Sequence, residues 1–252
     1  MAVTEHEATA LILDCRDQGE SDLIVTLFCR DLGRLTCIAK GAKRSKKRFV
    51  NKLELFSALQ TRYRESRTGG LALLTEAELL ESFLELRRQT PLYNTATVIR
   101  ELMLMATKDM EGDDSLFDLV IWALHSLNDG REPTNTLALF FIKFLDRIGY
   151  RPHFSTCAAC DIAVAPPQIY SFSHSRGAIL CASCCGPDLR AAPPVSLGTI
   201  KIIQAAQDQP LDRLHRLHFP PAIRREGLQL LQRYTSRLFQ REIHSWKFLN
   251  LS

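Results

Sequence analysis

The stretch that decides the fold is residues 8–41, ATALILDCRDQGESDLIVTLFCRDLGRLTCIAKG. Apolar side chains recur at alternate positions in three short runs within it, and turn residues such as Gly19 and Gly33 separate the runs. A period of two residues is that of a β-strand with one face on a core. The stretch therefore predicts strands over residues 8–16, 23–29 and 34–40.

Two further strand-like runs, 53–63 and 70–80, follow after a polar interruption. Five short strands in about eighty residues fit a small closed barrel such as the OB-fold, with an SH3-like barrel as the alternative. Cys15, Cys29 and Cys37 fall on the apolar phase of their strands, which favours buried small hydrophobes over reactive or metal-binding thiols.

From about Pro91 the apolar period changes to three and four residues, which is typical of packed helices. We expect helix N-caps at Asp114-Ser115 and Thr134-Asn135, helix stops at Gly130 and Gly149, and further helices over 196–206 and 221–244. The fold class is thus α+β, with a five-stranded OB-fold barrel over residues 1–80 and an α-helical domain over 81–252. In the last helix, a stripe of arginines recurs every fourth residue: Arg233, Arg237 and Arg241.

Two CxxC pairs give the most specific signal in the chain. They are Cys157-Ala-Ala-Cys160 and Cys181-Ala-Ser-Cys184, inside an insertion that spans 153–190. Such pairs supply four thiolates for a closed tetrahedral site, which suits a structural Zn²⁺ ion, although iron can occupy a rubredoxin-like site. Cys185, His153 and His174 are weaker ligand candidates. Two redox dithiols fit poorly, because neither CxxC opens a helix in a βαβ pattern.

A dense basic run follows the third expected strand. Seven cations lie within thirteen residues: Lys40, Lys43, Arg44, Lys46, Lys47, Arg48 and Lys52. Such a run predicts contact with a polyanion, while a solvated loop or a nuclear localisation signal would also explain it. Arg62, Arg64 and Arg67 could flank the same face of the barrel and contribute to DNA binding.

The overall composition is that of an ordinary globular protein, with 46% hydrophobic and 24% charged residues and a net charge of +4. Apolar runs are too short for a membrane span of about 20 residues, and the N-terminal residues lack a basic n-region. We therefore expect a cytoplasmic protein with no membrane partner, in which eight cysteines are metal ligands or buried thiols.

Recognisable catalytic motifs are missing from the sequence. No GxxxxGK[ST], GxGxxG, HExxH or GxSxG pattern occurs, which removes the phosphate-loop, dinucleotide, zincin and hydrolase interpretations. Glu78, Glu81 and Glu85 lie at helical spacing, so we expect a solvated helix face and not a catalytic carboxylate pair. The sequence therefore predicts a protein that is not an enzyme.

Several motifs in order resemble a known family. They are Gly19-Glu20-Ser21-Asp22 with Thr26-Leu27-Phe28, then Gly33-Arg34-Leu35, Ala39 to Lys43, Leu53 to Phe56, Ile148 to Pro152 and the two CxxC pairs. In this order they resemble the bacterial recombination mediator RecO over nearly the whole chain. The resemblance implies an N-terminal OB-fold, a helical domain with a zinc-binding insertion, and no enzymatic turnover.

The resemblance also implies a function and a set of partners. RecO proteins bind single- and double-stranded DNA, anneal complementary strands, contact the single-strand binding protein SSB, and work with RecR to load RecA. This chain would then act in DNA repair and recombination, in the cytoplasm at the nucleoid. We expect the acidic, apolar-tipped C-terminal tail of SSB to dock near Arg233, Arg237 and Arg241.

Two interpretations from other classes remain open at this point. One is a zinc-dependent enzyme that acts on nucleic acid, which an activity assay with a metal-dependence control would identify. The other is an OB-fold RNA-binding protein or transcription factor, which DNA-versus-RNA competition would identify.

Overall fold

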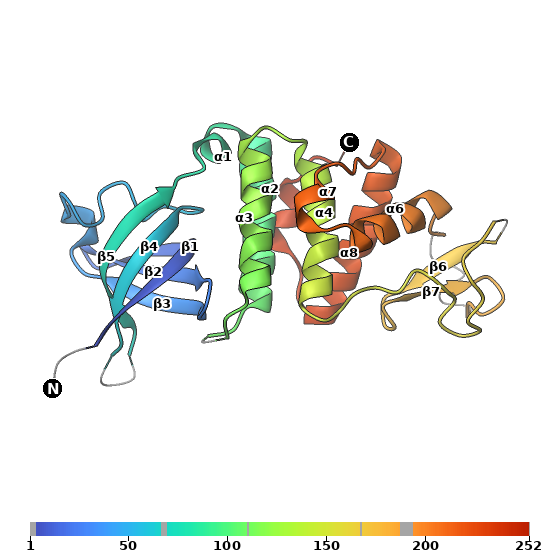
Figure 1. Cartoon of the computed structure of the whole chain (residues 1–252), viewed down its shortest axis with the longest axis horizontal. Coiled ribbons are helices and arrows are strands. Elements are labelled where there is room, and N and C mark those ends of the chain that lie inside the picture. The colour runs from blue at the N-terminus through green and yellow to red at the C-terminus, as the bar shows by residue number, and fades with distance from the viewer. Residues whose placement is uncertain (1–3, 67–69, 110, 167, 187–193, 252) are drawn as a thin grey trace. The chain divides into compact units, whose positions relative to one another are not determined.

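A computed structural model describes residues 4–66, 70–109, 111–166, 168–186 and 194–251 (Figure 1). The chain forms two compact units. The first comprises Met1–Gln89 with Arg100–Asn128, and the second comprises Thr90–Ile99 with Asp129–Ser252. No helix within the described ranges is long and apolar enough to cross a lipid bilayer.

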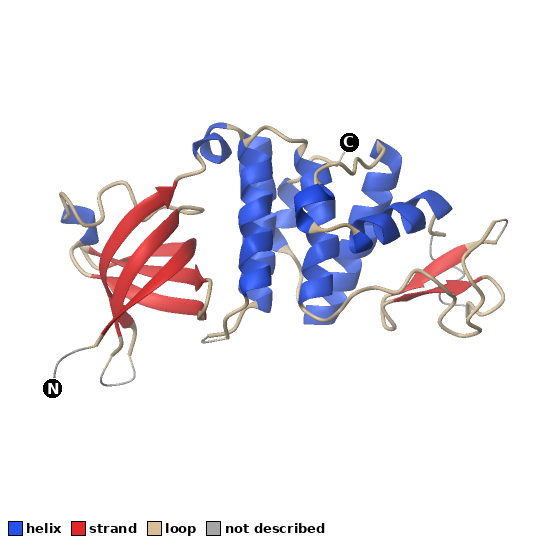
Figure 2. Ribbon diagram, viewed as in Figure 1, coloured by secondary structure: helices blue, strands red, loops and turns tan. Residues whose placement is uncertain are grey.

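The first unit contains a closed five-stranded barrel, which is the group of red strands nearest the N-terminus in Figure 2. Its strands are β1 (Glu5–Gln18), β2 (Asp22–Cys29), β3 (Gly33–Ala39), β4 (Ala58–Arg64) and β5 (Ala72–Glu81). They pair in the order β1-β2-β3-β5-β4, and β4 closes the barrel on β1. The β3–β5 pair is parallel and the others are antiparallel. The expected OB-like barrel is confirmed.

Alternation predicts that Leu11, Leu13 and Cys15 share the interior face of β1, but the structure differs at the first two positions. Ala10 and Ile12 belong to the barrel core, whereas Leu11 and Leu13 are buried outside that cluster. Both faces of the strand are covered at this point, so alternation alone could not distinguish them. A register shift between Ile12 and Asp14 then returns Cys15 to the core side, where it is partly buried.

Two other expectations for the barrel were wrong. The fourth strand begins at Ala58 and not at Leu53, because residues 53–57 form turns in which Phe56 has a φ of 67°. Of the carboxylates expected on one helix face, Glu78 and Glu81 lie on β5, which stays paired with β4 as far as Glu81, and only Glu85 lies on a helix.

The helices of the first unit cover the outer face of the barrel. They are α1 (Leu84–Arg88), the C-terminal part of α2 (Thr90–Ala106) and α3 (Asp114–Asn128). The rings of Phe28 on β2 and Phe117 on α3 pack 5.7 Å apart. The N-terminus of α3 is capped by Asp113, whose carboxylate accepts from the Leu116 amide at 2.9 Å, so the expected cap was one residue too late.

The second unit is built around α4 (Pro133–Arg147), whose residues from Thr134 to Leu145 are all buried. It packs against α6 (Leu197–Asp208) and α8 (Pro221–Phe239). Shorter elements complete the unit: α7 (Leu211–Leu214), the 3-10 helix η2 (His244–Phe248), and the hairpin β6 (Tyr170–Ser173) with β7 (Ala178–Cys181).

Helix ends in this unit partly differ from the expected ones. The Glu132 side chain caps α4, in place of the expected Thr134-Asn135, by accepting from the Thr134 and Asn135 amides. Gly130 and Gly149 do follow helices, as expected. The last helix ends at Phe239, because Gln240 adopts a left-handed conformation with a φ of 51°. Arg241 therefore lies beyond the helix and outside the expected arginine stripe.

Candidate metal centre and candidate nucleic-acid interface

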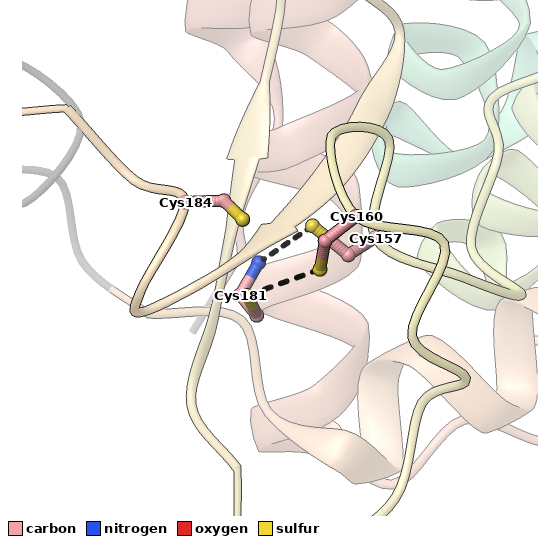
Figure 3. Close-up of side chains that lie close together, drawn as sticks. All are labelled: Cys157, Cys160, Cys181 and Cys184. Atoms are coloured by element: carbon pink, nitrogen blue, oxygen red, sulfur yellow. Dashed lines mark hydrogen bonds between the residues drawn. The ribbon is translucent and has the colours of Figure 1, made fainter.

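The four cysteines of the two CxxC pairs converge at the base of the β6–β7 hairpin. Figure 3 shows their sulfur atoms turned toward one another, from the 157–160 turn on one side and from the end of β7 and the following turn on the other. Their sulfur atoms all lie within 4.8 Å of one another. The set consists of Cys157, Cys160, Cys181 and Cys184. The expected convergence is confirmed, and the set is suited to a metal ion.

Backbone hydrogen bonds hold the first knuckle against the hairpin. The Cys157 amide donates to the Ile162 carbonyl at 2.9 Å, and the Ala158 amide donates to the Ile179 carbonyl on β7 at 2.9 Å. In addition, the Cys181 amide points at the Cys157 sulfur, 3.4 Å away. N–H groups aimed at sulfur are the usual outer partners of a thiolate ligand, since they stabilise its negative charge.

The acid–base chemistry of the four thiols favours a bound cation. Burial opposes ionisation of Cys157, but backbone N–H groups outweigh it and lower the pKa of this thiol to about 6. Hydrogen bonding with Cys160 and Cys181 instead raises the pKa of Cys184 to about 12. A divalent cation would stabilise the four sulfurs as thiolates, because its positive charge offsets their mutual repulsion.

Neither candidate histidine belongs to this cluster. His153 Nε2 lies 3.0 Å from the Thr156 hydroxyl. His174 follows β6, and its ring packs edge-on against Phe172 at 5.2 Å. Cys185 is buried beside Cys184 but is likewise outside the four-sulfur set.

The hairpin is also attached to helix α8. Phe172 stacks on Phe154 at 5.4 Å and meets Tyr234 of α8 edge-on at 5.5 Å. At the hairpin turn, a Cβ atom added to Gly177 would lie 2.5 Å from the Tyr234 hydroxyl oxygen. The four-cysteine cluster is therefore joined to the helices of its unit by close packing.

The basic run forms one connection between β3 and β4. It contains the 3-10 helix η1 (Ala42–Arg44), and its exposed cations include Lys40, Lys43, Arg44, Lys46, Lys47 and Arg48. We call residues 40–52 the basic loop. Lys52 is different, because its ammonium group donates to the Ala77 carbonyl at 2.7 Å and is half-buried.

Arg62 and Arg64 lie on the outer side of β4, beside carboxylates of β1 and β5. Arg62 pairs with Glu7 at 2.7 Å and with Glu76 at 3.1 Å, and Arg64 pairs with Glu5 at 3.3 Å. The bond to Glu7 and the nearby carboxylates raise the pKa of Arg62. Arg62 therefore pairs with two carboxylates and Arg64 with one. Lys46, Lys47 and Arg48, in contrast, pair with no carboxylate among the described residues. Arg67 lies outside the described residues.

The three cysteines of the barrel behave as expected from their strand phase. Cys29 and Cys37 are fully buried in its core, and Cys15 is partly buried. Burial raises the pKa of both Cys29 and Cys37 to about 12. Neither thiol is suited to a reactive or metal-binding role.

A pocket lies beside α8, the helix that carries Arg233 and Arg237. It has a volume of about 220 Å³, and Phe172, Val195 and Leu230 supply apolar walls. Arg225, Arg233 and His174 also line it. The His174 Nε2 atom is buried without a hydrogen-bond partner in the part of the chain that the structure describes. Burial, then the charges of Arg233 and Arg237, lowers the His174 pKa.

The chain matches two protein-family models, one over each of its two parts. Residues 1–83 match the family described as "Recombination protein O N terminal", and residues 91–247 match "Recombination protein O C terminal". The chain belongs to the RecO family. Membership supports a role in DNA repair and recombination, in agreement with the resemblance of the ordered motifs.

Curated relatives named "DNA repair protein RecO" cover most of the chain. The one from Syntrophobacter fumaroxidans is 35% identical over 87% of this chain and 86% of its own length. The one from Syntrophus aciditrophicus is 29% identical over 97% and 95%. The one from Roseiflexus is 31% identical over 97% and 85%.

Proposed function

We propose that this chain is a recombination mediator that binds single- and double-stranded DNA without chemical turnover and anneals complementary strands. With RecR, it would help to load RecA onto SSB-coated single strands, in the cytoplasm at the nucleoid. The observation that carries the proposal is an OB-like barrel whose basic loop presents Lys46, Lys47 and Arg48 without acidic partners among the described residues. Such cations track a phosphate backbone without reading its sequence.

The same proposal divides the chain by task. Residues 1–80 would be the DNA-binding OB-fold, and residues 81–252 a helical domain with the zinc-binding insertion 153–190. Sequence-independent binding suits a mediator that acts on any strand. Few aromatic side chains are available for base stacking near the loop, since Phe49 and Tyr63 are buried, so binding would depend mainly on charge.

For the metal centre we propose a structural Zn²⁺ ion held by Cys157, Cys160, Cys181 and Cys184. Zinc ions favour four thiolates in a closed tetrahedral set, and such a set leaves no coordination position for substrate or water. This argues against the zinc-dependent enzyme acting on nucleic acid that the sequence left open. An activity assay on nucleic acid with and without a chelator tests that alternative.

For the SSB tail we propose the pocket beside α8. A peptide with an apolar last residue and a free carboxylate needs an apolar floor with cations at its rim. Phe172 and Leu230 offer the floor, and Arg225 and Arg233 offer the cations, although Glu226 also lines the pocket. His174 adds a further cation only when its ring is protonated. Arg237 lies one turn further along α8, and Arg241 follows the end of the helix, where each could meet acidic residues earlier in the tail.

A strand-annealing assay tests the proposed function directly. Complementary oligonucleotides coated with SSB should anneal faster when the protein is added, and an RNA competitor of the same sequence should compete less well than DNA. No acceleration on SSB-coated DNA would contradict the mediator proposal. Stronger competition by RNA would favour an RNA-binding protein instead.

A further inference from the structure

The basic loop is fixed to the barrel at both of its ends. At its start, the Asp22 carboxylate accepts a hydrogen bond from the Gly41 amide at 2.8 Å, and the Lys43 amide donates to the Ser21 carbonyl at 3.0 Å. At its far end, Phe49 is buried in the barrel core. The Phe49 amide also donates to the Ser45 hydroxyl at 3.1 Å.

The bond between Asp22 and Gly41 is supported from two sides. The Ser21 hydroxyl donates to the same Asp22 oxygen at 2.9 Å. The Gly41 amide, the Ser21 hydroxyl and the charge of Lys40 together hold the pKa of Asp22 below its ordinary value. Asp22 is therefore ionised at neutral pH, and it fixes the point at which the chain leaves β3 and enters the loop.

Two other carboxylates hold cations of the loop, one near the end of β1 and one in the turn between β1 and β2. Asp17 pairs with the Lys43 ammonium at 2.8 Å, and Glu20 pairs with the Arg44 guanidinium at 3.3 Å. The Asp17 and Glu20 side chains are 75% and 92% exposed, so neither is needed to fill the core. An exposed carboxylate offers a cation what a phosphate offers it, namely anionic oxygens at hydrogen-bond distance.

We propose that Asp22 is a positioning residue for the DNA-binding loop, and that Asp17 and Glu20 are built-in competitors that occupy Lys43 and Arg44 until DNA phosphates displace them. The inference rests on the proposed function. The first contacts with DNA phosphates are made by Lys46, Lys47 and Arg48, because no carboxylate among the described residues has to be displaced from them. Lys43 and Arg44 engage only where the local phosphate density is high enough to replace Asp17 and Glu20.

The two roles predict opposite effects on DNA affinity. Removing the competing charges in a D17N/E20Q variant should tighten binding to single-stranded DNA by about two- to tenfold, as expected for freeing two exposed ion pairs. The slope of log affinity against log salt concentration should steepen by roughly 0.7 for each additional cation that binds a single-strand phosphate. A matched control, E65Q/E78Q, removes the same charge from exposed residues, one following β4 and one on β5, that hold no loop cation. It should change affinity much less, because neither carboxylate competes with DNA for Lys43 or Arg44.

Removing the Asp22 side chain should weaken DNA binding, in contrast to D17N/E20Q. The D22A variant removes a negative charge, which by itself favours DNA binding, yet it should weaken binding several-fold because the loop loses its anchor. The D22N variant keeps an oxygen that accepts from Gly41 and should retain wild-type affinity or exceed it. Thermal melting checks that each variant is folded. Should D22A fail to fold, the exposed D17N/E20Q pair still tests the competition.

The outcomes separate this inference from the proposed function. If K46A/K47A/R48A binds DNA as the wild type does, the loop is not the DNA site and the proposed interface is wrong. If that variant binds weakly while D17N/E20Q matches E65Q/E78Q, the interface stands and the competition is overturned. If folded D22A binds at least as tightly as D22N, Asp22 does not position the loop.

Discussion

Gly33 packs directly against the backbone of Glu111, so that a Cβ atom at Gly33 would lie 2.2 Å from the Glu111 carbonyl oxygen. The approach is reciprocal, because a Cβ atom at Gly112 would lie 2.2 Å from the Asp31 carbonyl oxygen. The turn between β2 and β3 is thereby held against the segment that precedes α3. Both segments belong to the first unit.

We expect Gly33→Ala to destabilise the first unit by about 2 kcal/mol or more. The substitution combines an unfavourable positive φ of 73° with a clash against a backbone that has little freedom to move. Gly19→Ala is the matched control, since Gly19 has a φ of 60° but no atom within 4 Å of its added Cβ. It should cost only about 1 kcal/mol. Urea unfolding measures both, and equal midpoints for the two variants would refute the close-packing argument.

Purified protein should contain one zinc ion per chain. The double variant C160S/C184S should lose the metal and melt at a lower temperature, because zinc binding to a closed thiolate site contributes directly to folding. Cys185→Ser is the control, since this buried thiol is adjacent but outside the four-sulfur set, and it should retain the metal. Metal analysis and thermal melting provide the two measurements. Unchanged zinc content in the double variant would exclude this site.

Replacing Lys46, Lys47 and Arg48 by alanine should weaken DNA binding at least about tenfold for every sequence. The slope of log affinity against log salt should fall by roughly 0.7 for each cation that no longer binds a single-strand phosphate. R62A/R64A serves as the comparison, because these arginines already pair with Glu5, Glu7 and Glu76. We expect that variant to bind DNA nearly as the wild type does. Fluorescence anisotropy over a salt series distinguishes loop binding from binding on the outer side of β4.

Binding of an SSB tail peptide should strengthen as the pH falls from about 7.5 toward 5.5. Burial and the neighbouring arginines lower the His174 pKa in the free protein, so the ring is neutral at pH 7.5. A bound carboxylate favours the protonated ring and raises its pKa, and binding therefore takes up a proton. His174→Gln should remove this pH dependence, and R233E/R237E should weaken binding at every pH. A pH dependence that persists in His174→Gln would place the tail elsewhere.

Much of the architecture followed from sequence pattern because the determinants are local. Alternating apolar residues specified β1 to β3, and glycines with positive φ ended helices at Gly130 and Gly149. The CxxC spacing specified the four-cysteine cluster, since each pair is confined to one tight turn. Strand alternation is also local, so it was sufficient to assign Cys29 and Cys37 to the barrel core.

What the sequence could not determine depends on residues far apart in the chain. The interior phase of β1 was decided by a bulge and by cover on its outer face, and the late start of β4 by turns at residues 53–57. Arg62 and Arg64 read as free cations until strand pairing set them opposite Glu7 and Glu5. In the same way, only the folded barrel brings Asp17, Glu20 and Asp22 against the basic loop. Local composition records how many charges a segment carries, but an electrostatic interaction depends on distance in space, and that distance is fixed by the tertiary structure.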